Sequence, residues 1–189
     1  MVSNLLPCRY WMQSTISTVA ASTIRSAQLR ELYAYWRLKA ANRKLPARAD
    51  IDPCEIPTLL PYLCLIDVVG NPAAFRYRLI GTKVVDLRGN DITGRWVDDD
   101  LYPKNLHDVV TMMSSAVETR APVVGHNRFW VPGKTWSKVE WLNLPLSTNG
   151  ERIDMLLMGF VKTDTPGDVS EQFPGTSLEM KLETINQLA

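Results

Sequence analysis

With 189 residues, 46% of them hydrophobic, the chain is long enough for one domain with terminal extensions and apolar enough to fill a core. No apolar run approaches the roughly 20 residues that span a bilayer, and residues 1–22 lack the continuous apolar centre of a secretory signal. The net charge of +1 hides an asymmetry, since residues 1–50 hold eight Lys and Arg against two Asp and Glu, and the remainder thirteen against eighteen. We therefore expect a cytoplasmic protein with no membrane contact and no nucleic-acid partner.

The first predicted element is an amphipathic helix from about Thr23 to Ala41, preceded by an irregular segment, residues 1–22. Its apolar stripe is aromatic and recurs at helical spacing, at Leu29, Leu32, Tyr33 and Trp36. A stripe of this kind must be covered, either by the chain's own sheet or by a second copy of the chain. We predict that it pairs two chains in a homodimer, while packing on the chain's own sheet would satisfy the same pattern.

This helix and a proline-rich connector make up residues 23–61, and the core of the domain is predicted at residues 62–162. The core begins with two strands joined by a short turn, which predicts an antiparallel hairpin of Leu63–Val69 and Phe75–Gly81. The second strand has an apolar and a cationic face, because Phe75, Tyr77 and Leu79 alternate with Arg76 and Arg78.

Two glycines punctuate the segment after this hairpin. Gly81 ends the strand before a short helix that carries Val84, Val85 and Leu87, and Gly94 closes the turn that follows. We expect both glycines to hold backbone angles that other residues avoid, so that replacing either with valine costs more than about 1 kcal/mol of stability.

The second half of the core reads as one longer helix and three strands. The helix is predicted from about Lys104 to Thr119, with an apolar face that includes Met113 and Val117. The strands are predicted at Pro122–Val131, Ser137–Leu146 and Arg152–Lys162. Residues 163–189 are predicted to be a linker and a short C-terminal helix, with Leu178, Leu182 and Ile185 on one side.

This order of elements predicts an α+β fold, a five-stranded antiparallel sheet with short helices on one face and the N-terminal helix packed outside. The core resembles a PAS domain, a small sensor fold, in the pattern Gly89, Ile92-Thr93-Gly94 and Tyr102-Pro103. The upstream segment resembles a bacterial family of stand-alone PAS-like proteins in Tyr35-Trp36, Leu45-Pro46-Ala-Arg48-Ala-Asp50, Ile51-Asp52-Pro53 and Leu59-Leu60-Pro61. The resemblance covers about residues 32–162.

The resemblance implies a sensory or protein-interaction module without catalytic output of its own. Its signal would leave through a partner signalling protein or through a changed homodimer. Two other interpretations stay open. One is a small enzyme that uses the cavity of the sheet, and the other is a ligand-free dimerisation scaffold.

A small ligand is expected between the sheet and the longer helix, where two apolar faces meet. The candidate pocket residues are Phe75, Tyr77, Leu79, Met113 and Val117, joined by His126 and Arg128 if the strand register turns them toward the helices. No catalytic residue is assigned, since neither a nucleophile nor an oxyanion motif accompanies His126 or Asp154.

The sequence favours neither haem nor flavin as a cofactor, and it identifies no ligand. His107 lies at the start of the long helix, from which haem-binding PAS domains take their iron ligand, but a surface position explains a lone histidine there. The light-sensing flavin chemistry of PAS domains needs a cysteine on the short helix, and Thr82–Arg88 contain none. No metal site is expected, because Cys8, Cys54 and Cys64 form no CxxC pair or Cys/His cluster.

Overall fold

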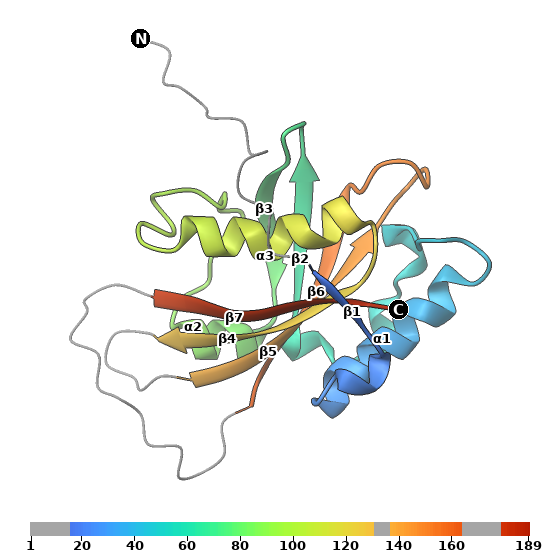
Figure 1. The fold of residues 1–189 in the computed structure, drawn as a ribbon, viewed down its shortest axis with the longest axis horizontal. Helices are drawn as coiled ribbons and strands as arrows, with labels where there is room; N and C mark the ends of the chain where they lie inside the picture. The colour runs from blue at the N-terminus through green and yellow to red at the C-terminus, as the bar shows by residue number, and fades with distance from the viewer. Residues whose placement is uncertain (1–15, 131–136, 164–178) are drawn as a thin grey trace.

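A seven-stranded sheet organises the structure, a computed structural model that describes residues 16–130, 137–163 and 179–189 (Figure 1). The strands lie in the order β1-β7-β4-β5-β6-β2-β3. Every neighbouring pair is antiparallel except β1 and β7, which are parallel. The bounds are β1 (Ser17–Val19), β2 (Leu63–Val69), β3 (Ala74–Ile80), β4 (Val123–Trp130), β5 (Ser137–Leu146), β6 (Met155–Lys162) and β7 (Glu179–Leu188).

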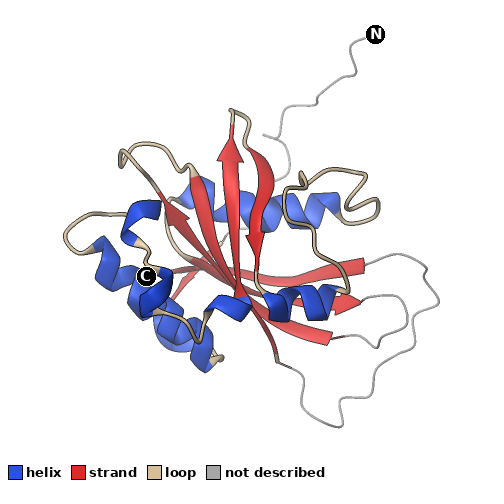
Figure 2. Ribbon diagram, turned by 180° about the vertical axis from the view of Figure 1, so that it is seen from behind, coloured by secondary structure: helices blue, strands red, loops and turns tan. Residues whose placement is uncertain are grey.

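Helices cover both faces of this sheet (Figure 1 and Figure 2). One face, on which the side chains of Met158 and Phe160 lie and which we call the front face, carries α2 (Thr82–Arg88) and α3 (Leu106–Thr119), and α3 packs on β5 and β7. The back face carries α1 (Ala27–Ala40), which packs on β5 and β6. Short 3-10 turns complete the connections, at Ala21–Thr23, Arg48–Asp50, Pro53–Glu55 and Leu60–Tyr62.

Five adjacent strands, β4-β5-β6-β2-β3, form the antiparallel sheet that the sequence predicts, and the α+β class is confirmed. The strand count and both ends of the chain need correction. Residues 179–188 form β7 instead of a helix, and Ser17–Val19, within the segment predicted to be irregular, pair with β7 as β1. The physical reason is that β4 would otherwise leave a row of unpaired backbone groups at the sheet edge, and β7 satisfies them.

The β2–β3 hairpin is present as predicted, with one irregularity that changes which side chains face the core. Ile66 pairs with Tyr77 but Leu65 pairs with Leu79, so Arg78 is an extra residue in β3. Such a bulge reverses the alternation of side chains beyond it. Leu79 is therefore 46% exposed on the back face, and Ile80 takes the front position.

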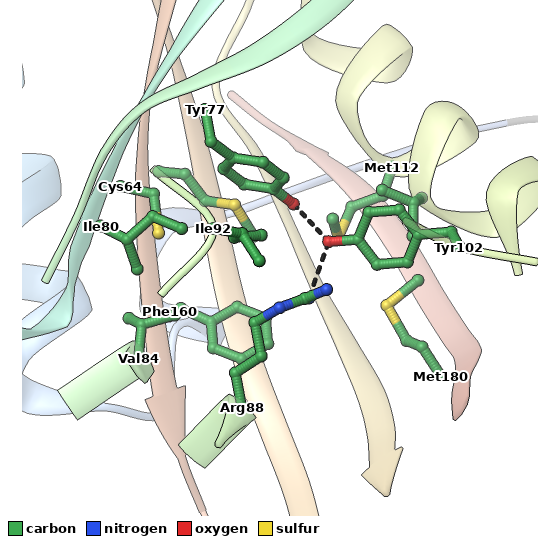
Figure 3. Close-up of a pocket in the computed structure, with 12 residues that line it drawn as sticks. Cys64, Tyr77, Ile80, Val84, Arg88, Ile92, Tyr102, Met112, Phe160 and Met180 are labelled. Atoms are coloured by element: carbon green, nitrogen blue, oxygen red, sulfur yellow. Dashed lines mark hydrogen bonds between the residues drawn. The ribbon is translucent and has the colours of Figure 1, made fainter. Parts of the chain in front are cut away.

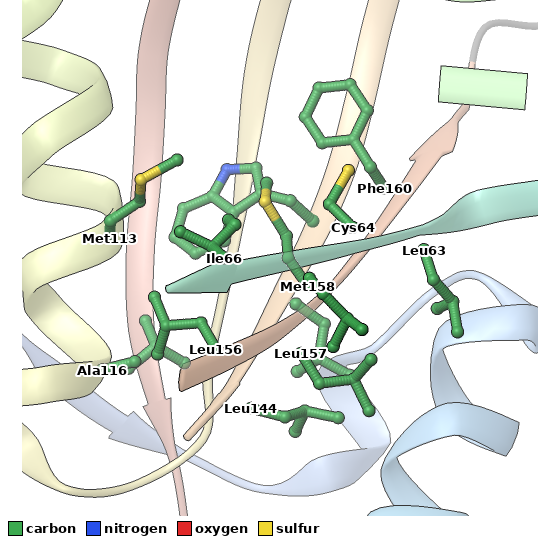
Figure 4. Close-up of a cluster of buried hydrophobic side chains, with 14 of the residues drawn as sticks. Leu63, Cys64, Ile66, Met113, Ala116, Leu144, Leu156, Leu157, Met158 and Phe160 are labelled. Atoms are coloured by element: carbon green, nitrogen blue, oxygen red, sulfur yellow. The ribbon is translucent and has the colours of Figure 1, made fainter. Parts of the chain in front are cut away.

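The core has one layer on each side of the sheet (Figure 4). In front, Met113 and Ala116 of α3 lie over Ile66 and Leu156. Behind, α1 sits directly on β6, since a β-carbon at Gly159 would lie 2.4 Å from Leu29 Cδ2. All of these side chains are buried.

The apolar stripe of α1 is covered by the chain's own sheet. Leu29, Leu32 and Trp36 are at most 3% exposed, and the Trp36 indole Nε1–H donates to the Pro145 carbonyl at 3.1 Å. Tyr33 is partly buried and stacks on Trp36 with ring centroids 6.4 Å apart. Of the two ways in which the sequence allows the stripe to be covered, this is packing within one chain.

Gly81 is required for a reason other than the one that the sequence suggests. Its φ is −70°, which any residue adopts, so the expectation of an unusual backbone angle is wrong there. Glycine is required instead because the backbone at Gly81 packs closely against the backbone of Leu60 and Pro61. A β-carbon at Gly81 would lie 2.4 Å from the Leu60 carbonyl oxygen and 2.5 Å from that of Pro61. At Gly94 the expectation holds, with φ at +83° and open space around it.

Candidate functional site

A small cavity lies between the front face of the sheet, α2 and the start of α3 (Figure 3). Its volume is about 30 Å³, enough for a water molecule or a very small ligand. The wall is mostly apolar and includes three methionines, Met112, Met158 and Met180. The other described lining residues are Cys64, Tyr77, Ile80, Val84, Arg88, Ile92, Tyr102, Val109 and Phe160.

Secondary structure explains how these side chains converge. Met158 and Phe160 alternate along β6, so both face the cavity while Gly159 between them faces α1. Arg88 is the last residue of α2, which ends because Gly89 adopts the left-handed conformation with φ at +90°. Met180 comes from β7. The side-chain amide of Asn105, at the beginning of α3, donates to the Met180 carbonyl at 2.7 Å and so links β7 to α3.

The polar end of the cavity is a chain of three side chains. Arg88 Nη1 donates to the Tyr102 hydroxyl at 2.8 Å, and the Tyr102 and Tyr77 hydroxyls share a hydrogen bond of 2.7 Å (Figure 3). All three residues are at most 6% exposed. The Arg88 guanidinium also lies 4.9 Å from the centre of the Tyr102 ring. Its Nε is buried and has no hydrogen-bond partner among the described residues.

Burial keeps both phenols neutral. It raises the pKa of Tyr77 well above the usual value, and the neighbouring Tyr102 raises it further. Burial also raises the pKa of Tyr102, although the positive charge of Arg88 works in the opposite direction. The two tyrosines therefore act as hydrogen-bonding hydroxyl groups near neutral pH and not as phenolate bases.

Cys64 contributes an unreactive thiol to the cavity wall. Burial raises its pKa to about 12, and the hydrogen bond with the Gly81 backbone and the charge of Arg88 offset this only in part. Since the thiolate is the nucleophile, a thiol of this kind does not attack an electrophile at neutral pH.

We expect Cys64 in the folded protein to react with iodoacetamide at pH 8 at least about 100-fold more slowly than Cys54, which is exposed. Peptide mapping by mass spectrometry after timed labelling measures the two sites separately. Denaturant should bring the two rates together. Equal rates in the native protein would show that the cavity wall is open.

Of the side chains predicted to surround a pocket, only Tyr77 lines this cavity. Phe75 and Met113 are buried in the adjacent core, and Val117 packs against it. Leu79 is turned to the back face by the bulge at Arg78.

His126 and Arg128 also lie on the back face, away from the cavity. The register of β4 turns Asn127 to the front instead, where it accepts from Trp141 Nε1 at 2.9 Å. Arg128 forms an ion pair of 2.7 Å with Glu183. His126 contacts Thr184, with Nδ1 3.0 Å from its hydroxyl oxygen.

A second polar cluster, which we call the α1 clamp, consists of Glu140 with Arg25 and Ser26 at the beginning of α1. The Glu140 carboxylate accepts from the backbone N–H groups of Arg25 at 2.8 Å and Ser26 at 2.7 Å, and from the Ser26 hydroxyl at 2.6 Å. His126 Nε2 lies 3.4 Å from the same carboxylate. A buried carboxylate at a helix N-terminus satisfies free N–H groups and matches the helix dipole.

These contacts control the ionisation of Glu140. Burial alone would raise its pKa, but His126, the two backbone N–H groups and the Ser26 hydroxyl outweigh burial and lower the pKa to about 2. The carboxylate is therefore occupied in holding α1 on β5 and is not available as a base. Asp154, the other acid considered with His126, accepts from the Thr148 backbone N–H at 2.8 Å in the loop after β5.

Sequence reasoning missed Arg88 and Tyr102, the centre of the cavity's polar end. An arginine in the last turn of a short helix normally reads as a solvent-exposed partner of the helix dipole. The only available signal was Gly89, which marks the helix end but does not reveal which way Arg88 points.

Comparison with known sequences identifies the family. The PAS domain family model matches residues 24–161. A comparison with curated proteins found no match. In the described part of the chain, no helix is long and apolar enough to cross a membrane. The same residues contain no cluster of three or more His, Cys, Asp or Glu that could hold a metal ion.

Proposed function

Because the chain belongs to the PAS domain family, we propose that it is a sensory module that takes a small ligand in the cavity between the sheet and α2, without catalytic output of its own. PAS domains are generally non-catalytic sensory modules. The observation that carries the ligand proposal is the cavity itself, an apolar space with a hydrogen-bonding group at one end. Such a combination is typical of small-molecule sites.

The wall of the cavity supports a ligand larger than the 30 Å³ of free space. Methionine is unbranched and flexible, so Met112, Met158 and Met180 can change rotamer and enlarge the space at small cost. On binding, these side chains would exchange contacts with one another for contacts with the ligand.

A route from the cavity to the back of the molecule runs through β6. Met158 and Phe160 line the cavity, and Gly159 between them lies directly beneath Leu29 and Leu32 of α1. A shift of β6 on ligand binding would therefore displace α1. The α1 clamp also links this helix to β5. The output would be a changed surface around α1, read by a partner signalling protein or by a second copy of the chain.

The alternative of a small enzyme gains no support from the lining residues. Cys64 has a pKa of about 12, and the pKa values of Tyr77 and Tyr102 are raised. Near neutral pH none of these groups is an ionised nucleophile or base.

Native mass spectrometry of the full chain tests the proposal. We expect a small-molecule adduct that is released on denaturation, retained in Cys54→Leu, and lost in Cys64→Leu, because a larger side chain at Cys64 fills the cavity. Cys54 is exposed and serves as the matched control. A wild-type protein without any adduct would favour the ligand-free scaffold, and the same spectra report whether a dimer forms.

A further inference from the structure

Three charged side chains are buried in the described residues, and one of them differs from the other two. Asp67 forms ion pairs of 2.9 Å with Arg76 and 2.7 Å with Arg78. Glu140 is held by the beginning of α1. Arg88 is 6% exposed, and no carboxylate of the described residues lies within ion-pair distance of it.

Arg88 also has unused hydrogen-bonding capacity. A guanidinium group has five N–H donors, and the one side-chain hydrogen bond of Arg88 in the described structure is that from Nη1 to the Tyr102 hydroxyl. Its buried Nε has no partner there. Burying a cation without a counter-charge is costly, and so is leaving its donors unpaired. Asp67 and Glu140 show that elsewhere the fold provides partners for buried charges.

The surroundings of Arg88 favour an anion with a short apolar part. Arg88 is the one charged residue among the described lining residues, so its positive charge is not balanced within the cavity. Tyr77 and Tyr102 supply neutral hydroxyl groups beside it (Figure 3). Beyond this polar end, the wall consists of aliphatic, aromatic and thioether groups.

We infer that the cavity binds a small monocarboxylate, whose carboxylate pairs with the Arg88 guanidinium and whose short chain lies against Met112, Met158 and Met180. The inference rests on the proposed function, since it names the ligand class of the same cavity. Arginine suits this role because its planar fork holds a carboxylate through two parallel hydrogen bonds. The free volume of about 30 Å³ favours a chain of few carbons.

Isothermal titration of the full chain with a matched series tests the inference. The probes are acetate, propionate and butyrate, each compared with its amide, which has nearly the same shape and no charge. Chloride and phosphate at equal ionic strength report whether any anion suffices. We expect propionate to bind at least about 10-fold more tightly than propionamide, because charge-assisted hydrogen bonds are stronger than neutral ones.

Variants locate the binding. Arg88→Met keeps a long apolar side chain and should lower the affinity for propionate about 10- to 100-fold. Arg95→Met is the matched control, since Arg95 is exposed, and it should leave the affinity unchanged. The comparison of acid and amide uses the wild-type protein, so the test does not depend on how well Arg88→Met folds.

Equal affinities for propionate and propionamide would overturn the inference. So would an Arg88→Met variant that binds propionate as tightly as the wild type, or no binding of any carboxylate at about 10 mM. Binding of phosphate or chloride in preference to the carboxylates would also contradict it. A neutral adduct in the native mass spectrum would overturn this inference while leaving the proposed sensory function intact.

Discussion

Replacing Gly81 with alanine is expected to lower the free energy of unfolding by about 3 kcal/mol or more. The added β-carbon would lie 2.4 Å from the Leu60 carbonyl oxygen and 2.5 Å from that of Pro61, which are backbone atoms that cannot rotate away. The 3-10 turn at Leu60–Tyr62 and the beginning of α2 would have to separate. Because α2 carries Val84 and Arg88, the cavity would be disturbed as well.

Gly94→Ala is the control for this prediction. Gly94 has φ at +83° with nothing within 4 Å of its β-carbon position, so alanine costs only the backbone strain, about 1 to 2 kcal/mol. Urea unfolding followed by circular dichroism measures both losses. If the two variants lost the same free energy, the close approach at Gly81 would be absent in solution.

Replacing Glu140 with glutamine is expected to cost about 3 kcal/mol near neutral pH, because the folded protein lowers the pKa of this carboxyl from 4.5 to about 2. The charged carboxylate holds the Arg25 and Ser26 N–H groups, and a neutral amide holds them more weakly. The control is Glu183→Gln, which removes an ion pair with Arg128 at a partly exposed position and should cost less than about 1 kcal/mol.

The effect of Glu140→Gln should depend on pH in a defined direction. Because the pKa of Glu140 is lower in the folded protein, its carboxylate contributes its full stabilisation at pH values above 4.5, the pKa in the unfolded chain. This contribution is lost as the pH falls toward about 2, the pKa in the folded protein. The difference in unfolding free energy between the wild type and Glu140→Gln should therefore shrink across this range. A difference that stays constant from pH 7 to pH 3 would show that the carboxylate acts through its shape and not through its charge.

Elements with a long and regular pattern were predictable from the sequence. β5 spans Ser137–Leu146, as predicted, and α3 begins within two residues of the predicted helix start at Lys104. Both carry an apolar pattern long enough to separate a helical from a strand period. The end of the chain was not predictable in this way, because Leu178, Leu182 and Ile185 match a helical spacing. The segment Glu179–Leu188 forms a strand because it pairs with the otherwise unpaired edge of β4.

The candidate site was predictable only in its location. The space between the sheet and the helices follows from the apolar faces, but one extra residue at Arg78 turns Leu79 out and Ile80 in. No local pattern reveals a bulge of this kind. The local sequence also does not reveal that the Arg88 side chain points into the cavity, because its direction depends on where α2 ends relative to Tyr102.

The most direct test of the ligand cavity is nuclear magnetic resonance of the full chain with 13C-labelled methionine methyl groups. Met112, Met158 and Met180 line the cavity, whereas Met113 and Met155 are buried outside it and serve as internal controls. On titration with propionate, the three cavity signals should shift and the two control signals should stay in place. Cavity signals that do not move with either propionate or propionamide, or shifts of equal size at all five positions, would contradict the binding of a short carboxylate or its amide in this cavity.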